Sequence, residues 1–208
     1  MRERFLRRYT LLPSLIYMLT EKKLTLLDPQ SWDDKNDSYY LKVYREKKRL
    51  QSVLALCFTV DVETYHHWSV FAGGSAGVCI QFKRDELLDA VKTRRGISAD
   101  KVKYLLLTQI RNRRLKVAQL PFCKRYAFKH ESEFRLLYES KKMPRAALDV
   151  PIPLSSIARI TLSPWLPQAL SEHVKRTLHA IPGCNKLSIA RSTLISNQEW
   201  KNLGEEAR

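Results

Sequence analysis

The chain has 208 residues, of which 44% are hydrophobic, so it is long and apolar enough to bury one globular core. Lys and Arg number 37 against 21 Asp and Glu, which gives a formal net charge of +16. This excess predicts attraction to polyanions, with nucleic acid first, an acidic protein partner second and an anionic membrane third. A basic surface that serves only solubility is the alternative.

Two features indicate where the chain resides. No apolar run approaches the ~18 residues of a membrane-spanning helix, and the basic N-terminus breaks at Pro13 without a small-residue cleavage site. We therefore expect neither a membrane protein nor a secreted one. The four cysteines lie far apart and lack the spacing of a zinc site, so we expect reduced core thiols and a cytoplasmic location.

The first part of the chain predicts alternating helices and strands. Residues 11–28 are typical of a helix that begins after Pro13 and is followed by a short strand at 24–27. A polar loop, DPQSWDDKND, then leads to an amphipathic helix over 39–50.

The middle of the chain is the most strand-like. The continuous apolar run at 52–60 predicts a buried strand, 63–72 a helix, and 76–83 a second buried strand after a Gly-Gly-Ser break. A further helix should begin near Asp85 and end at Gly96.

The remaining elements complete the predicted fold. They are a strand at 102–107, a basic helix at 108–119, a strand at FRLLYE, a strand around ARITL, a helix within 163–183 and a last strand at LSIARSTL. We predict one α+β domain over residues 1–208, with a central, largely antiparallel sheet flanked by helices. A core at about 8–140 would precede a helix-strand extension at 141–208.

Positive charge is concentrated in one stretch, because no acidic residue lies between Asp100 and Glu131. Basic side chains neutralise phosphates and aromatic ones stack on unpaired bases, so this stretch predicts nucleic-acid binding. The candidate residues are Arg111, Arg113, Arg114, Lys116, Lys124, Arg125 and Lys129. The interleaved aromatics, Tyr104, Phe122, Tyr126 and Phe128, could equally belong to the core.

The loop WDDKND places Asp33, Asp34 and Asp37 within a few residues of one another. Such a loop can hold a divalent metal through oxygen ligands, or its side chains can fix a sharp turn. The spacing is not that of an EF-hand, so the turn is favoured and no metal is expected.

His66, His67 and Trp68 form a second candidate. Adjacent histidines on a helix point about 100° apart and rarely ligate one metal. One of them can face a cleft beside Trp68, and an ordinary polar helix face is the alternative.

The segment HESEFR is the strongest candidate for chemistry. In a strand, Glu131 and Glu133 would project to one face, with Lys129 and Arg135 on the same alternation. A carboxylate pair can hydrogen-bond a ribose, stabilise positive charge at its anomeric carbon or act as a general base. A salt-bridge ladder is the structural alternative.

The order of these motifs resembles a bacterial family, the domain of unknown function 2971. The resemblance is carried by RYTLLPSLIYML, KLTLLDP, the WDDKND loop, LCFTVD, WSVFAGGSAGVCIQF and KRYAFKHESEFRLLY. It covers roughly residues 8–140, although the Asn-Asp-Pro of the family is Asn36-Asp37-Ser38 here. It implies an accessory or effector component of bacterial defence or toxin loci, with an antitoxin as a possible partner.

The sequence contains no P-loop, GxGxxG, HExxH or GxSxG motif. It resembles an ADP-ribosyltransferase in having Arg8 or Tyr9 early, a central apolar strand and a late Glu-x-Glu. That likeness implies NAD as cofactor, with Arg8, Tyr9 and Trp68 binding it, Glu133 stabilising the transition state and Glu131 activating the acceptor. The alternatives are a non-catalytic nucleic-acid-binding module and a metal-dependent nuclease that uses Asp33, Asp34, Asp37 and Glu133.

Overall fold

The computed structural model describes residues 3–112 and 114–207. Its strands are β1 (Phe5–Leu11), β2 (Lys23–Leu27), β3 (Ser52–Thr59), β4 (Gly77–Lys83), β5 (Ile97–Lys101), β6 (Lys103–Leu105), β7 (Cys123–Arg125), β8 (Glu133–Ser140), β9 (Ala147–Pro151), β10 (Ile157–Leu162) and β11 (Ile189–Arg191). Its α-helices are α1 (Leu12–Glu21), α2 (Lys35–Lys47), α3 (Tyr65–Phe71), α4 (Arg84–Lys92), α5 (Leu107–Asn112), α6 (Gln168–His179) and α7 (Gln198–Glu205). Short 3₁₀ helices are η1 (Pro29–Ser31), η2 (Val117–Phe122), η3 (Tyr126–Glu131) and η4 (Leu154–Ser156).

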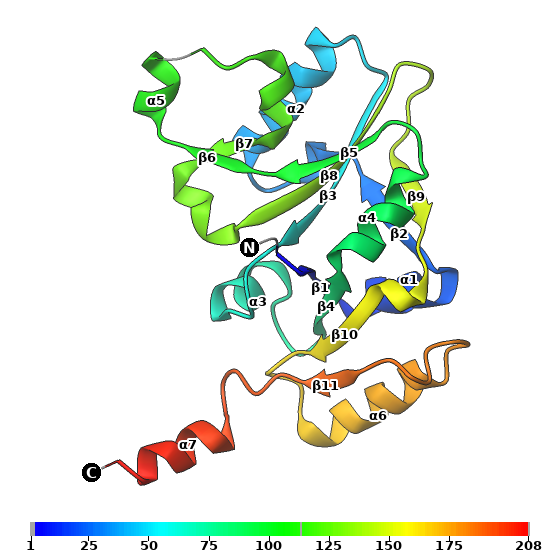
Figure 1. The fold of residues 1–208 in the computed structure, drawn as a ribbon, viewed down its shortest axis with the longest axis vertical. Helices are drawn as coiled ribbons and strands as arrows, with labels where there is room; N and C mark the ends of the chain where they lie inside the picture. The colour runs from blue at the N-terminus through cyan, green and yellow to red at the C-terminus, as the bar shows by residue number, and fades with distance from the viewer. Residues whose placement is uncertain (1–2, 113, 208) are drawn as a thin grey trace.

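The predicted fold class is confirmed. Within the described residues, nine strands form one sheet in the order β11-β10-β4-β1-β3-β2-β9, with β8 beside β3 and β5 beside β8 (Figure 1). Only β10 and β11 run parallel in it. The short strands β6 and β7 form a separate parallel pair. None of the described helices has the length and apolar character that crossing a bilayer demands.

Several predicted elements differ from the observed ones. The strand β1 was not expected, because Arg7 and Arg8 interrupt its apolar pattern; pairing along its whole length with β4 makes it a strand. The helix predicted after Pro13 begins at Leu12 instead, but it ends at Glu21 beside the two lysines, as expected, where Lys22 adopts a left-handed conformation. The basic helix expected at 108–119 is confined to α5, because its like charges have no acidic i+4 partners.

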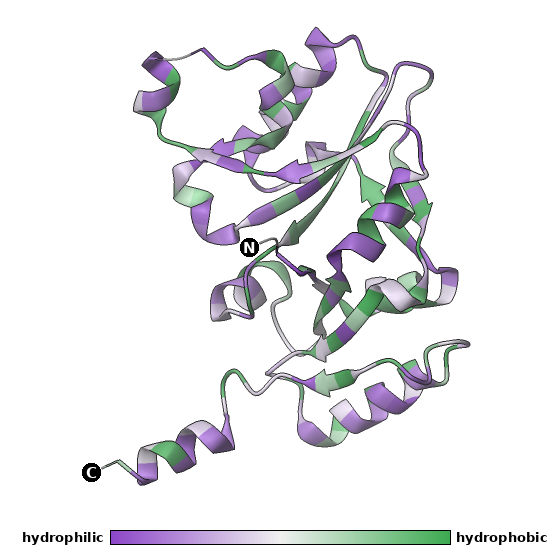
Figure 2. Cartoon of the chain, viewed as in Figure 1, coloured by the Kyte–Doolittle hydropathy of each residue, from purple (hydrophilic) through white to green (hydrophobic). Residues whose placement is uncertain are grey.

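Side-chain alternation divides the sheet into two faces. On one face, Leu6, Leu56 and Phe82 belong to the main core, which α1 and α4 cover. On the other face, one cluster packs β3 against α2 through Leu41 and Val53. A second cluster packs Tyr9, Trp68, Ala72 and Cys79. Figure 2 shows mainly hydrophobic residues along β3 and a mixture of hydrophilic and hydrophobic residues along the helices α4 and α6. The two clusters share no residue, and each contributes to the lining of one cavity, through Ala55 and Tyr9 respectively.

The sheet is split next to β1. Although β1 pairs fully with β4, it meets β3 only where Arg7 lies opposite Thr59. Strand β2 likewise meets β3 only where Leu27 lies opposite Ala55. The strands thus diverge on either side of these single contacts. This divergence creates the space for a site.

Gly77 fixes the close turn between α3 and β4. A Cβ at this position would lie 2.0 Å from the carbonyl oxygen of Ala72, so only glycine fits. Gly77, which lies just after the predicted Gly-Gly-Ser break, therefore sets how tightly α3 returns to the sheet.

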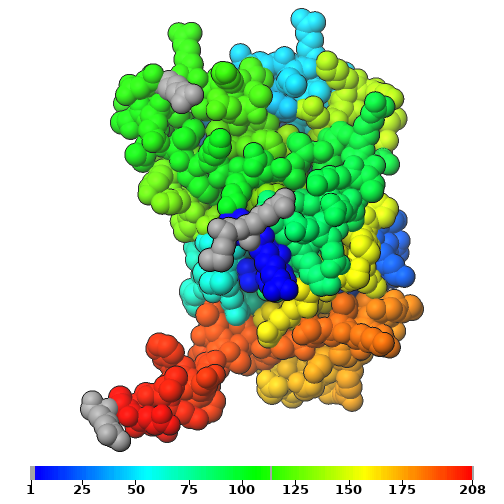
Figure 3. All heavy atoms as spheres, in the orientation of Figure 1, coloured from blue at the N-terminus to red at the C-terminus, as the bar shows by residue number. Residues whose placement is uncertain are grey.

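The C-terminal extension continues the sheet and then leaves it. Strands β10 and β11 extend the sheet beyond β4, and α6 packs against them through Leu178. The helix α7 has no buried residue and stands away from the rest of the molecule (Figures 1 and 3).

Candidate active site

A cavity of about 470 Å³ occupies the split in the sheet. Its walls come from β1, β3, the loop around η1, α3 and the η3–β8 segment. Its lining includes Arg7, Arg8, Tyr9, Trp32, Asp33, Asp34, Cys57, His67, Phe71, Lys124, Phe128, Glu131 and Glu133. The volume lies within the range of small-ligand sites. The cavity therefore brings the early Arg8–Tyr9 pair together with the late Glu-x-Glu.

Arg8 and Tyr9 both line the cavity, although neighbours on a strand project to opposite faces. The split makes this possible: the Arg8 guanidinium crosses the gap and donates to the Cys57 carbonyl at 3.2 Å. Burial lowers the pKa of Arg8. Tyr9 is buried and stacks on His67 at a centroid distance of 5.4 Å.

Trp68, expected to bind cofactor, does not line the cavity. Its side chain is fully buried, lies edge-on to Tyr9 and donates from Nε1 to a Glu63 carboxylate oxygen at 2.6 Å. Tyr9, on which Trp68 packs, does line the cavity. Trp68 therefore supports a residue of the cavity wall.

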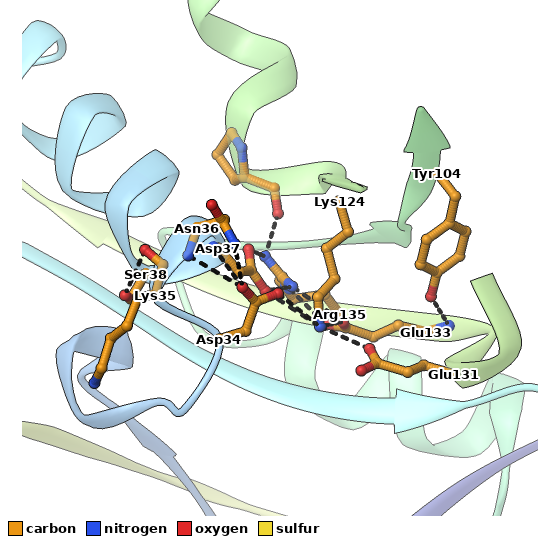
Figure 4. A network of polar contacts seen from close by, with 11 residues as sticks. Asp34, Lys35, Asn36, Asp37, Ser38, Tyr104, Lys124, Glu131, Glu133 and Arg135 are labelled. Carbon is orange, nitrogen blue, oxygen red and sulfur yellow. Dashed lines mark hydrogen bonds and ion pairs between the residues drawn. The ribbon is translucent and has the colours of Figure 1, made fainter. Parts of the chain in front are cut away.

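Arg135 is the centre of a buried polar cluster (Figure 4). It is 0% exposed, and its Nε and Nη2 donate to the two Glu133 oxygens at 2.6 and 3.0 Å. Its Nη1 and Nη2 donate to the two Asp37 oxygens at 3.0 and 2.6 Å, and Nη1 also reaches the Pro121 carbonyl at 2.7 Å. All five N–H groups of the guanidinium are therefore used.

Lys124 joins the same cluster from β7. Its Nζ lies 2.6 Å from Glu131 Oε2, 3.3 Å from Glu133 Oε2, 3.5 Å from Asp37 Oδ2 and 3.9 Å from Asp34 Oδ2. Four carboxylates thus meet two cations, and two negative charges remain in excess when all are ionised. With 8% of its side chain exposed, Lys124 is engaged by these carboxylates, and its predicted contact with a phosphate stays a prediction.

The two glutamates differ in electrostatic state. Burial acts to raise the pKa of Glu133, but the charge and hydrogen bonds of Arg135, helped by Lys124, outweigh it and lower the pKa to about 2. Burial raises the pKa of Glu131, and Lys124 only partly offsets this. Glu133 is accordingly a fixed negative charge with both oxygens bonded. Glu131 has Oε2 on Lys124, and its Oε1 has no hydrogen-bond partner among the described residues.

The Glu133 shift predicts a specific loss of stability in acid. Its folded pKa of about 2 lies below the ordinary 4.5, so the unfolded chain binds more protons between these values. The stability that Glu133 contributes is complete above pH 4.5 and is lost as the pH falls toward 2. Asp37 and Glu131, whose pKa values are raised by burial, act in the opposite direction.

Urea denaturation at a series of pH values, compared with Glu133→Gln, isolates this contribution. The difference between the two proteins should shrink as the pH falls through the window from 4.5 to 2. A difference that stays constant across that window would contradict the assigned ionisation.

Tyr104 fixes the start of β8. Its hydroxyl oxygen accepts the Glu133 backbone N–H at 2.7 Å. Tyr104→Phe leaves this N–H without a partner and should cost about 1 to 2 kcal/mol of unfolding free energy. Thermal unfolding would measure the loss. Tyr39→Phe is a matched control, because Tyr39 is 60% exposed, and it should stay within about 0.5 kcal/mol of the parent. Equal stability of the two variants would argue against the bond.

The Glu-x-Glu pair is not built as a simple strand alternation. Glu131 ends η3, Ser132 is left-handed, and only Glu133 lies in β8. Arg135 shares the face of Glu133 as predicted. Lys129 does not share it and is exposed, with its Nζ near the Tyr126 ring. The two carboxylates nonetheless lie close together, because both form ion pairs with Lys124.

The WDDKND loop forms a helix cap, as favoured from the sequence. Asp34 accepts the backbone N–H groups of Asn36 and Asp37 and begins α2. Asp37 is paired with Arg135, and Asp33 lines the cavity. Across residues 3–112 and 114–207, no group of three or more His, Cys, Asp and Glu side chains is arranged to hold a metal.

The two histidines have different environments. His67 is buried, lines the cavity and contacts the Glu131 carbonyl through Nε2 at 3.2 Å. Its Nδ1 faces the Thr64 hydroxyl at 2.5 Å. Burial lowers the pKa of His67, which favours the neutral ring. His66 instead packs against His130 at a centroid distance of 4.0 Å. His67 thus supports the backbone that carries Glu131.

The other predicted nucleic-acid residues lie outside the cavity. Arg111, Arg114, Lys116, Arg125 and Lys129 are exposed, and Arg113 lies outside the described residues. Sequence reasoning missed Arg7, Trp32, His67 as a support for Glu131, and the Asp37–Arg135 pair. No spacing in the sequence joins Asp37 to Arg135, because only the tertiary fold brings α2 onto β8.

Comparisons with known proteins add the following. No family model matches the sequence, and no curated protein matches it. The likeness to the domain of unknown function 2971 family stays a prediction.

Solved structures of Thermus sp. 2.9 DarT are similar in fold. The complex with ADP-ribosylated ssDNA has a TM-score of 0.47 and 11% identity, covering 92% of this chain and 95% of that chain. The complex with NAD+ has a TM-score of 0.46 and 10% identity, covering 92% and 96%. The complex with carba-NAD+ has a TM-score of 0.47 and 13% identity, covering 92% and 97%. This likeness concerns the course of the backbone alone.

Proposed function

We propose that this chain uses NAD to transfer ADP-ribose to an acceptor on or near nucleic acid. The observation that carries the proposal is the composition of the cavity. Two arginines on β1 and a carboxylate pair on the η3–β8 segment line one space of about 470 Å³, together with aromatic side chains. NAD has the complementary parts: an anionic pyrophosphate, flat rings and a cationic nicotinamide.

The charge distribution suits cleavage of the nicotinamide–ribose bond. When that bond breaks, its electron pair leaves with nicotinamide, and positive charge develops at the ribose anomeric carbon. The excess negative charge of the cluster around Lys124 favours such a cation, and Glu133 supplies an ionised carboxylate that needs no reorganisation. Arg7 and Arg8 are placed to bind the pyrophosphate.

Glu131 is suited to the second half of the transfer. An acceptor oxygen or nitrogen forms the new bond to the anomeric carbon and gives up a proton. Glu131 has an oxygen that is not held by Lys124, and its raised pKa favours proton uptake. Because Arg135 already donates to both Glu133 oxygens and Lys124 donates to one of them, Glu133 acts by its charge.

The test is nicotinamide release from NAD by the purified protein, with and without single-stranded DNA or RNA. Mass spectrometry of the oligonucleotide would detect added ADP-ribose. The proposal expects release and an adduct with at least one of the two acceptors. Absence of nicotinamide release under all these conditions would refute it.

A non-catalytic nucleic-acid-binding module is the second candidate. It is favoured by the exposed cations between Arg111 and Lys129, which lie on a stretch without acidic residues. Salt-sensitive binding of nucleic acid without any NAD turnover would select it. A place in bacterial defence or toxin loci, with an antitoxin as partner, remains part of the proposal that the family resemblance implies.

A further inference from the structure

The strands β6 and β7 separate the cavity from a second pocket. Side chains alternate on this parallel pair, in which Tyr104 lies opposite Lys124 and Lys103 opposite Cys123. Tyr104 and Lys124 face the carboxylate cluster. Lys103, Leu105 and Cys123 face the other way and line a pocket of about 490 Å³. This second pocket is completed by Gln109, Ile110, Arg114, Leu115 and Gln119.

The polar groups that this pocket offers are hydrogen-bond donors. Gln109 Oε1 accepts the Leu106 N–H, and Gln119 Oε1 accepts the Lys116 N–H, each at 2.8 Å. The two amide oxygens are thereby engaged, which leaves their NH₂ groups as the available donors. Lys103 and Arg114 add two cations, and no carboxylate lines the pocket within the described part of the chain.

The pocket also has an apolar wall. Leu105, Ile110 and Leu115 line it, and Ile110 and Leu115 are partly exposed. An anion alone would need no such wall. A nucleotide has both parts, a phosphate for the cations and a flat base for the apolar side chains. The base must be unpaired, because a duplex hides its face.

We infer that this second pocket binds one unpaired nucleotide of a single-stranded nucleic acid, with its phosphate on Lys103 and Arg114. The inference deepens the nucleic-acid part of the proposed function and does not require that NAD be cleaved. The bound nucleic acid would lie on the side of β6 and β7 that faces away from the carboxylate cluster. On β7, Lys124 would then face the cavity proposed to bind NAD, and its neighbour Cys123 would face the pocket that binds the nucleotide.

Fluorescence anisotropy with a labelled single-stranded oligonucleotide tests this binding without NAD. Lys103→Gln/Arg114→Gln should weaken binding roughly tenfold and reduce the slope of log K against log salt by about 1.4. The matched control is Lys141→Gln/Lys186→Gln, which removes the same charge from exposed residues that line neither pocket. It should change affinity less than about twofold. Ile110→Ala should weaken binding without changing the salt slope.

Three results would overturn the inference. The first is equal weakening by the two double variants. The second is binding of a duplex of the same sequence with the same sensitivity to the pocket variant. The third is displacement of the oligonucleotide by inorganic phosphate as effectively as by a nucleoside monophosphate. Nicotinamide release without acceptor, measured in parallel, should be unchanged in the pocket variant. If the parent protein releases none while the pocket variant still loses binding, the NAD proposal fails and the pocket stands.

Discussion

Replacement of Arg135 by methionine should lower the free energy of unfolding by about 3 to 5 kcal/mol. The arginine is fully buried and neutralises Asp37 and Glu133, which are 2% and 4% exposed. Without it, Lys124 is the nearest cation left for both carboxylates, and it reaches them only at 3.5 and 3.3 Å. Urea denaturation followed by tryptophan fluorescence would measure the loss.

Two further variants make this result specific. Arg159→Met, at an exposed position of β10, removes the same charge and should change stability by less than about 0.5 kcal/mol. Adding Asp37→Asn and Glu133→Gln to Arg135→Met should recover part of the loss, because no uncompensated charge is then buried. An Arg135→Met protein as stable as Arg159→Met would show that the cluster is not buried in solution.

Glu131→Gln should reduce ADP-ribose transfer to an oligonucleotide by about 10²- to 10⁴-fold, the range for loss of a general base. The amide keeps the size of the side chain but cannot take the acceptor proton. Nicotinamide release should fall less, because Glu133 and its fixed charge remain. Initial rates of release and of transfer, measured on the same sample, would separate the two steps.

Two further variants, Glu133→Gln and Glu139→Gln, test whether the two carboxylates of the cavity have different roles. Glu133→Gln should lower both release and transfer, because it removes the charge that favours the ribose cation. Glu139→Gln, on the same strand but bonded to Tyr44 away from the cavity, should leave both rates unchanged. Transfer at the parental rate by Glu131→Gln would contradict its role as the base.

Replacements of Glu131 and of Arg135 should affect stability and activity to different degrees. Glu131 makes one ion pair, with Lys124, and its replacement leaves Lys124 beside three other carboxylates, so the loss should be smaller than the roughly 3 to 5 kcal/mol expected for Arg135. Arg135 makes contacts with two carboxylates and a backbone carbonyl, so its loss affects the fold first. A thermal melt of each variant, run before any rate is measured, would distinguish lost chemistry from lost structure.

The sequence by itself determined the elements whose residues carry a local pattern. The apolar runs at β3 and β4 predict buried strands, and both strands are observed. The α+β class, the turn in the WDDKND loop and the choice of Glu131 and Glu133 as candidates followed from such local signals.

Only the tertiary structure decided the features that depend on distant partners. The polar segment around Arg7 and Arg8 becomes a strand because β4 pairs with it, and the gap beside it depends on how β1 and β3 diverge. Lys124 belongs to the stretch expected to bind phosphates, yet the proximity of four carboxylates turns it into an internal counterion. The sequence gives the charge of each residue, but the partner of that charge is a residue distant in sequence that only the tertiary fold brings close.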